Sequence, residues 1–277
     1  MLTRRLFIDS RHASSGNSGN FTYPLNEQLV LPREAVCYIT DVSCSHSWYT
    51  TEASKNASVY IVESQGGTDT ARHLQLPEKS HDVLTLGQDL QTVLNSASKV
   101  VSGTYTVTYN PPRNTYTISV TGGSTFKYYS KRMFQNPALL GEFNTAGGTY
   151  ILFAADNADE LIGLRSENDY SSVSSLESEF LDVRHIHSLY IHSDSFTSYN
   201  SSGPGGSRSI LCRIPVNTQF GDQIEWRHNE LPHDYVACGQ ISAATLQFSL
   251  RDSYNRQVDL QGSHISFTLL FAEQPII

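Results

Sequence analysis

Apolar and polar residues alternate through the last part of the chain, from residue 241 to residue 271. This period of two is typical of β-strands with one buried face. Turn-forming residues, among them Asp252, Asn255 and Gly262, separate two such runs. The sequence therefore predicts a strand, a connection and a closing strand that ties the chain end into a sheet. The residues that share a face are Leu246, Phe248 and Leu250, and then Ile265, Phe267, Leu269 and Phe271.

Shorter stretches of the same kind occur elsewhere and are separated by polar loops. Gly, Ser and Asn dominate residues 10–20 and 196–208, which are predicted as loops. Pro24 and Pro32 place residues 21–31 at a sheet edge or boundary, because proline cannot donate to a strand ladder. Outside the middle of the chain we expect about eight strands, the number of an all-β single jelly-roll, an antiparallel β-sandwich. The other predicted strands cover residues 4–9, 36–48, 57–63, 150–154, 186–192, 209–216 and 222–227.

The pattern changes to a helical period near residue 82. A helix is predicted over residues 84–94, with Thr85 as its candidate cap and Gln88 three residues later. Two strands joined by a turn at residues 111–114, a third candidate strand and a short helix over residues 132–140 follow. We therefore expect a small α+β insertion, a helix-plus-hairpin subdomain over residues 82–145. The jelly-roll domain would comprise residues 1–81 and 146–277.

Charge and hydropathy exclude some classes of partner. The net charge is −8, with 19 Lys and Arg against 27 Asp and Glu, so a wide basic face for nucleic acid is not expected. The one basic concentration, Arg4, Arg5 and Arg11, is interpreted as a solvated chain end. No run approaches the roughly 20 apolar residues of a membrane helix, and no apolar stretch after Arg5 indicates a secretory signal.

Four widely spaced cysteines form no CxxC pair, and we interpret them as reduced thiols of a protein assembled inside a cell. Cys37 and Cys44 are an odd number of residues apart on one predicted strand. Their side chains are therefore expected on opposite faces of that strand, beyond disulfide reach. The other two are Cys212 and Cys238.

Candidate chemistry is sparse. His185 and His187 would share one strand face, the minimal geometry of a metal pair, but His192 falls on the other face and no further ligand is spaced for a closed zinc site. Asp222 and Glu225 could form an acid–base pair, but two solvated carboxylates explain them as well.

Sequence motifs add no catalytic assignment. The glycine-rich residues 203–206 follow no strand and open no helix, so they are not expected to hold phosphate. The aromatic residues near 46–49 suit either a contact patch or the edge of a core. We assign no catalytic residue, metal ligand or cofactor, and we expect the protein not to be an enzyme.

Six stretches, in order along nearly the whole chain, carry a resemblance to a known family. They are FIDSR…GNFTYPL, DVSCSHSWYT with residues 56–62, LTLGQDLQTVLNS leading into YTVTYN…YTISV, HSLYIHSDSF, SRSILCRIPV and LRDSYNRQVDLQGSHISFTLLF. Together they resemble the penton, or minor capsid, proteins of Polinton/Maverick-type and adintovirus-like viruses.

The resemblance implies a structural capsid protein of the virion that is assembled inside the host cell. It implies single jelly-roll pentamers at icosahedral five-fold vertices, next to a major capsid protein with a double jelly-roll. A spike protein or a host receptor would be a further partner. Two alternatives remain open from the residues: a receptor-binding or spike/fibre attachment protein, and a jelly-roll enzyme of cupin or glycosidase type, for which the His185–His187 pair is the only route.

Overall fold

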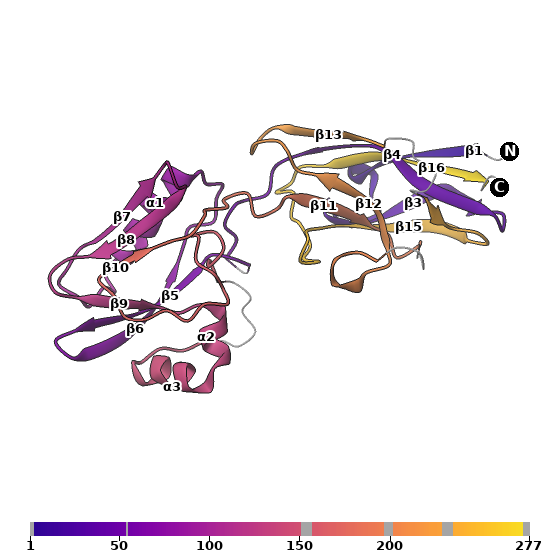
Figure 1. The fold of residues 1–277 in the computed structure, drawn as a ribbon. Coiled ribbons are helices and arrows are strands. Elements are labelled where there is room, and N and C mark those ends of the chain that lie inside the picture. The colour runs from indigo at the N-terminus through magenta and orange to yellow at the C-terminus, as the bar shows by residue number, and fades with distance from the viewer. Residues whose placement is uncertain (1–2, 54, 151–156, 197–201, 229–234, 274–277) are drawn as a thin grey trace. The chain divides into compact units, whose positions relative to one another are not determined.

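The computed structural model describes residues 3–53, 55–150, 157–196, 202–228 and 235–273. The chain folds into two compact units (Figure 1). The sandwich unit comprises Met1–Trp48 and Ile186–Ile277, and the inserted unit comprises Tyr49–His185. The predicted insertion, residues 82–145, lies inside the inserted unit, which extends further on both sides. The predicted strand over residues 150–154 lies almost wholly outside the described residues.

Two antiparallel sheets form the sandwich unit. In the first, the strand order is β1-β16-β4-β13, with β14 also paired to β4; in the second it is β12-β11-β15-β3-β2. The strands of the first sheet are β1 (Thr3–Asp9), β4 (Ala35–Ser45), β13 (Gln223–Arg227), β14 (Val236–Ala237) and β16 (Ile265–Glu273). Those of the second are β2 (Ser15–Asn17), β3 (Asn20–Val30), β11 (Ser188–His192), β12 (Ile210–Pro215) and β15 (Ser242–Arg251).

The strand pairings define a jelly-roll. When the short strands β2 and β14 are set aside, the first strand pairs with the eighth, the second with the seventh, the third with the sixth and the fourth with the fifth. Such a ribbon of four pairs is wrapped into a sandwich where β16 joins β4 and β11 joins β15. The predicted fold class, an all-β single jelly-roll with a small α+β insertion, is confirmed.

The two closing strands lie in opposite sheets and meet across the core. The alternating apolar residues of β15 and β16 are all buried, and the rings of Phe248 and Phe267 lie 5.0 Å apart between the sheets. Burial of each such side chain contributes about 1.5–3 kcal/mol. The period of two in the sequence therefore reflects one apolar core between two sheets.

A β-bulge corrects the predicted orientation of two cysteines. The pairing of β16 with β4 shifts register so that Thr268 faces Asp41 and Leu269 faces Ile39, which leaves one extra residue in β4. The bulge reverses the alternation, so Cys37 and Cys44 both point into the core, contrary to the prediction. All four cysteines are free thiols.

The loop predicted at residues 10–20 contains regular structure. A 3-10 helix spans Ser10–His12, and β2 pairs with β3. The Asn17 side chain accepts hydrogen bonds from the backbone of Gly19 and Asn20 at 3.0 and 2.9 Å, which tightens the turn between the two strands. Because β2 and β15 flank it, β3 is not an edge strand over its first residues. Its Pro24 is accommodated at a register shift between Ala243 and Thr245.

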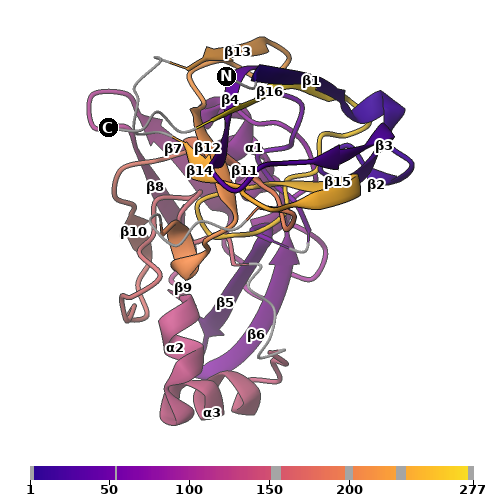
Figure 2. The ribbon, with the colours of Figure 1, turned by 90° about the vertical axis from the view of Figure 1, so that its right-hand side faces the viewer.

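The inserted unit holds two three-stranded sheets and three helices (Figures 1 and 2). One sheet consists of β6 (Thr68–Gln75), β5 (Ser58–Gln65) and β9 (Thr125–Tyr128), and the other of β10 (Ser175–Glu177), β8 (Thr115–Val120) and β7 (Tyr105–Asn110). The helices are α1 (Val83–Leu94), α2 (Lys131–Gln135) and α3 (Pro137–Thr145).

Strand β5 explains why this unit is wider than predicted. Its side chains are buried on both faces: Val59 and Ile61 pack in the cluster that includes α1, whereas Tyr60 and Val62 pack against α2 and α3. A strand buried on both faces is central to its domain. The sequence assigned residues 57–63 to the jelly-roll because a continuous apolar run does not reveal which sheet it joins.

Helix α1 begins one turn earlier than predicted. Asp82 is extended and accepts hydrogen bonds from the backbone of Leu84 and Thr85 at 2.9 and 2.8 Å, while the Thr85 hydroxyl accepts one from the backbone of Asp82. Asp82 is therefore the N-cap and Thr85 its partner in a capping box. The short helix predicted at residues 132–140 is two helices, because Pro137 forces an extended conformation on Asn136.

Candidate functional site

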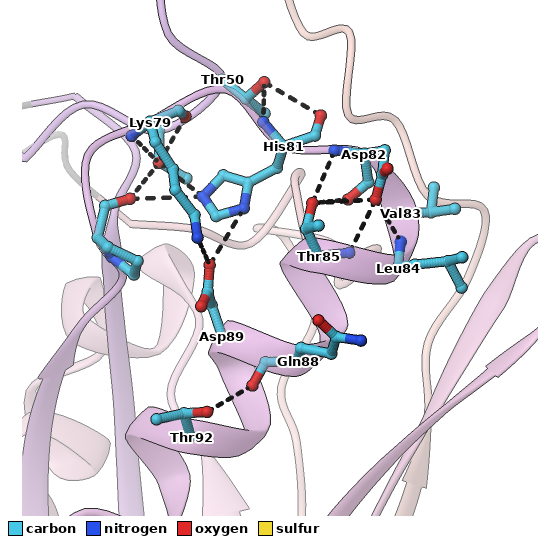
Figure 3. Close-up of polar contacts among 12 residues, drawn as sticks. Thr50, Lys79, His81, Asp82, Val83, Leu84, Thr85, Gln88, Asp89 and Thr92 are labelled. Carbon is cyan, nitrogen blue, oxygen red and sulfur yellow. Dashed lines mark hydrogen bonds and ion pairs between the residues drawn. The ribbon is translucent and has the colours of Figure 1, made fainter.

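A polar cluster lies beside the start of α1 and joins it to the segment that enters the inserted unit (Figure 3). The His81 imidazole lies between two partners, with Nε2 3.0 Å from the Thr51 hydroxyl and Nδ1 3.4 Å from the Asp89 carboxylate. Lys79 Nζ lies 2.6 Å from the same carboxylate. The cluster brings together three segments that are distant in sequence.

The hydroxyl–imidazole–carboxylate order resembles that of a nucleophilic triad. The Thr51 residue is fully buried and the side chain of His81 has no exposed surface. The Thr51 hydroxyl also donates to the carbonyl of Pro77 at 2.5 Å and accepts from the backbone of Lys79 at 3.2 Å. A substrate has no access to this hydroxyl, so the cluster ties segments together and performs no chemistry.

Electrostatics support the structural role. Burial lowers the pKa of His81, and the nearby Asp89 opposes this shift less strongly. Sequence reasoning singled out neither Thr51 nor His81. The one local signal was the Asp82-to-Thr85 capping box, which fixes the backbone immediately after His81.

The histidines considered as metal ligands do not come together. His185 and His187 precede β11 and fall on either side of the boundary between the two units. His192 is buried in β11, and its Nδ1 lies 3.1 Å from the hydroxyl of Ser209. Over the described part of the chain, no group of three or more His, Cys, Asp or Glu side chains is arranged to hold a metal ion.

The remaining candidates are surface or core features. Asp222 and Glu225 are both exposed, and Asp222 accepts a hydrogen bond from the backbone of Gln219 at 3.1 Å. The glycine-rich residues form a short 3-10 helix, Pro204–Gly206. His46 stacks on Trp48 with ring centroids 4.2 Å apart, and both residues are buried. The aromatic strand end is therefore the edge of a core.

Surface composition differs between the two units. Every lysine lies in the inserted unit, whereas the sandwich unit has arginine as its only strongly basic residue. Protein interfaces are depleted in lysine and enriched in arginine and aromatic residues. The lysines are Lys55, Lys79, Lys99, Lys127 and Lys131.

Large apolar side chains are exposed at a few positions. The most exposed in the sandwich unit is Phe7, at 73%. Among the residues that the structure describes, no helix combines the length and the apolar character that crossing a membrane requires.

The strand order identifies the chain as a single jelly-roll protein with an insertion between the third and fourth strands. Among solved structures, the chain is similar to the mavirus penton protein, at 12% identity and a TM-score of 0.49, over 98% of this chain and 99% of that one. It is also similar to a chain in the cryo-EM structure of the Sputnik virophage, at 11% identity and a TM-score of 0.44, over 99% and 98%. No family model and no curated protein matches the sequence.

Proposed function

We propose that this chain is a structural capsid protein, a penton that forms pentamers at the five-fold vertices of an icosahedral virion. The observation that carries the proposal is the polarity of the sandwich unit. Both connections to the inserted unit leave from one end of the jelly-roll, and both chain ends lie at the other. The mavirus protein described above carries the name of penton, and the proposal gives this chain the same role.

The strand register establishes this polarity. In the pairing of β16 with β4, Ile265 faces Cys44 at one end, and Glu273 faces Ala35 at the other. The chain leaves for the inserted unit just beyond β4, and Thr3 pairs beside Ala272 near the opposite end. Figure 1 shows the two chain ends together at the far end of the sandwich unit. A protein that plugs a shell needs such distinct ends.

The chain has the composition of a contact protein. The order of the six sequence stretches that resemble the Polinton/Maverick-type pentons supports a vertex position next to a double jelly-roll major capsid protein. A spike protein or a host receptor would bind the inserted unit, at the end away from the termini. We propose no enzymatic role, because the one triad-like group is buried and already hydrogen-bonded.

Particle shape tests the proposal. The purified full-length protein should form rings of five subunits by negative-stain microscopy and a species of five times the chain mass by light scattering. A protein that stays monomeric at high concentration in both low and high salt would overturn it. A monomer that binds host cells through residues 49–185 would instead support the attachment-protein alternative.

A further inference from the structure

The two edges of the sheet β1-β16-β4-β13 carry opposite chemistry. At one edge, Leu6 and Ile8 of β1 face the core, so Arg5 and Phe7 project outward. Phe7 is 73% exposed, the most exposed large apolar side chain of the sandwich unit, and Arg5 is exposed beside it. An exposed aromatic residue next to an arginine is the combination found at interface hot spots.

Arg5 is the cation of this edge that lacks a partner. Arg4 lies 4.0 Å from Glu27, and Arg11 forms hydrogen bonds to Asp9. Within the described residues, the Arg5 guanidinium makes no ion pair and no hydrogen bond. The β1 edge therefore presents an uncompensated positive charge and an apolar ring. We call Arg5 and Phe7 the β1 patch.

The opposite edge of the same sheet is acidic. Ile224 of β13 is buried, so Glu225 projects outward, and Asp222 is exposed just before the strand. Asp41 of β4 is exposed across from Arg227, which is the only basic side chain among them. Glu225 has no ion-pair partner over the described ranges. We call Asp41, Asp222 and Glu225 the β13 patch.

A ring requires this kind of asymmetry. Cyclic assemblies larger than a dimer use heterologous contacts, in which one surface of a subunit meets a different surface of its neighbour. Two complementary patches at opposite edges of one sheet satisfy this requirement. A two-fold contact of the β1 patch with itself would instead oppose like charges. The absence of lysine from the sandwich unit fits a surface that is covered in the assembly.

We infer that the β1 patch of one subunit docks on the β13 patch of the next subunit in the ring. This inference rests on the proposed ring assembly and adds the two surfaces that form it. Arg5 would face Glu225, and Phe7 would be buried between the subunits. Arginine suits this place because its planar guanidinium can bind a carboxylate with two hydrogen bonds.

Charge reversal with rescue tests the inference. Arg5→Glu should weaken ring formation at least tenfold in protein concentration, and Phe7→Ser should do the same. The double variant Arg5→Glu with Glu225→Arg should restore rings, because it re-forms the pair with the charges exchanged. Arg33→Glu, which reverses an exposed arginine outside both patches, is the matched control and should assemble like the unmodified protein. Tryptophan fluorescence would confirm that each variant is folded, and Arg5→Ala replaces any variant that is not.

Each outcome separates this inference from the proposed function. Rings that persist in Arg5→Glu and Phe7→Ser at all concentrations would overturn the inference and leave the pentamer proposal standing. Loss of rings in Arg5→Glu without rescue by Glu225→Arg would overturn the assignment of the partner surface. An unmodified protein that never forms rings would overturn the proposed function itself.

Discussion

The two units reach a stable core by different means. The sandwich unit buries one continuous apolar cluster between its sheets, and its long strands satisfy their backbone groups in ladders. The inserted unit has short strands, two apolar clusters and long connections. Its connections have no sheet ladder to join, so buried side chains supply their hydrogen bonds.

A buried ion pair shows how the inserted unit is held together. Glu63 of β5 and Arg72 of β6 are 2.5 Å apart and almost fully buried. Arg72 also donates to the carbonyl of Leu94 at 2.9 Å, which satisfies the C-terminal end of α1, and Glu63 accepts from the backbone of Val100 at 2.9 Å. One pair thus joins a sheet, a helix end and a loop. The sandwich unit has no equivalent among its described residues.

The two tryptophans make the comparison measurable. Trp48 and Trp226 both lie in the sandwich unit, so tryptophan fluorescence follows the unfolding of that unit alone. Far-ultraviolet circular dichroism follows both units. Differences between the two signals therefore separate the two cores.

The largest expected effect comes from removing the inserted unit. A variant in which residues 49–185 are replaced by a Gly/Ser linker should retain a folded jelly-roll with a cooperative fluorescence melt, because loop closure depends weakly on length. Replacing only residues 82–145 should unfold what remains of the inserted unit, because β5 and β6 lose α1 and β9. If the longer deletion abolishes the fluorescence melt while the shorter one preserves both signals, the unit boundaries are wrong.

Breaking the buried ion pair should affect one unit only. Arg72→Met leaves Glu63 buried without its partner, which should cost about 3–5 kcal/mol of the free energy of unfolding of the inserted unit. Arg113→Met removes the exposed pair with Glu177 and should cost about 0–1 kcal/mol. Denaturant unfolding by circular dichroism would measure both, and an equal shift of the fluorescence transition in Arg72→Met would contradict the independence of the units.

Acid should act on the two units with opposite sign at two buried groups. Burial raises the pKa of Asp159 in the inserted unit from 3.8 to about 6, so its stabilising contribution is present at low pH and is lost as pH rises through 6. Between pH 7 and pH 5 it should add roughly 1 kcal/mol to the stability of that unit. Asp159→Asn should remove this increment, measured as the difference between its melts at the two pH values and those of the unmodified protein.

The sandwich unit provides the contrasting case. Burial lowers the pKa of His192 from 6.5 to about 4, so its contribution is present above pH 6.5 and is lost as pH falls through 4. The fluorescence melt should therefore fall between pH 7 and pH 5, and His192→Asn should reduce this fall. His81 acts in the same direction within the inserted unit, which is why Asp159 must be tested by difference. A pH response of Asp159→Asn identical to that of the unmodified protein would refute the Asp159 prediction.

The smallest expected effect concerns the thiols. Hydrogen bonding with Cys238 and burial raise the pKa of Cys37, and burial raises the pKa of Cys44 to about 12, so neither forms a reactive thiolate near neutral pH. Adding a reductant should leave both melts unchanged. Mass spectrometry after alkylation in denaturant should find four modified cysteines, and fewer than four in freshly prepared protein would reveal a disulfide.

Much of the fold follows from local pattern. The alternation in residues 246–250 and 265–271 determined two strands and their buried faces, and the helical spacing after Asp82 determined α1. These features depend on how one segment meets a core, and the side-chain period records that directly. The order of the six stretches along the chain likewise pointed to a jelly-roll capsid protein before any pairing was known.

Tertiary structure decided which segments belong together. The apolar run of β5 is compatible with either unit, and only its neighbours on both faces place it in the inserted one. Strand β6 carries Arg72 at a position that looks like solvent-exposed sequence, and its burial depends on Glu63 and the end of α1. The bulge that turns Cys37 and Cys44 to one face arises from the register with β16. The β1 and β13 patches face opposite ways only because β16 and β4 lie between them: pairing between distant segments is a property of the whole chain, and no local period encodes it.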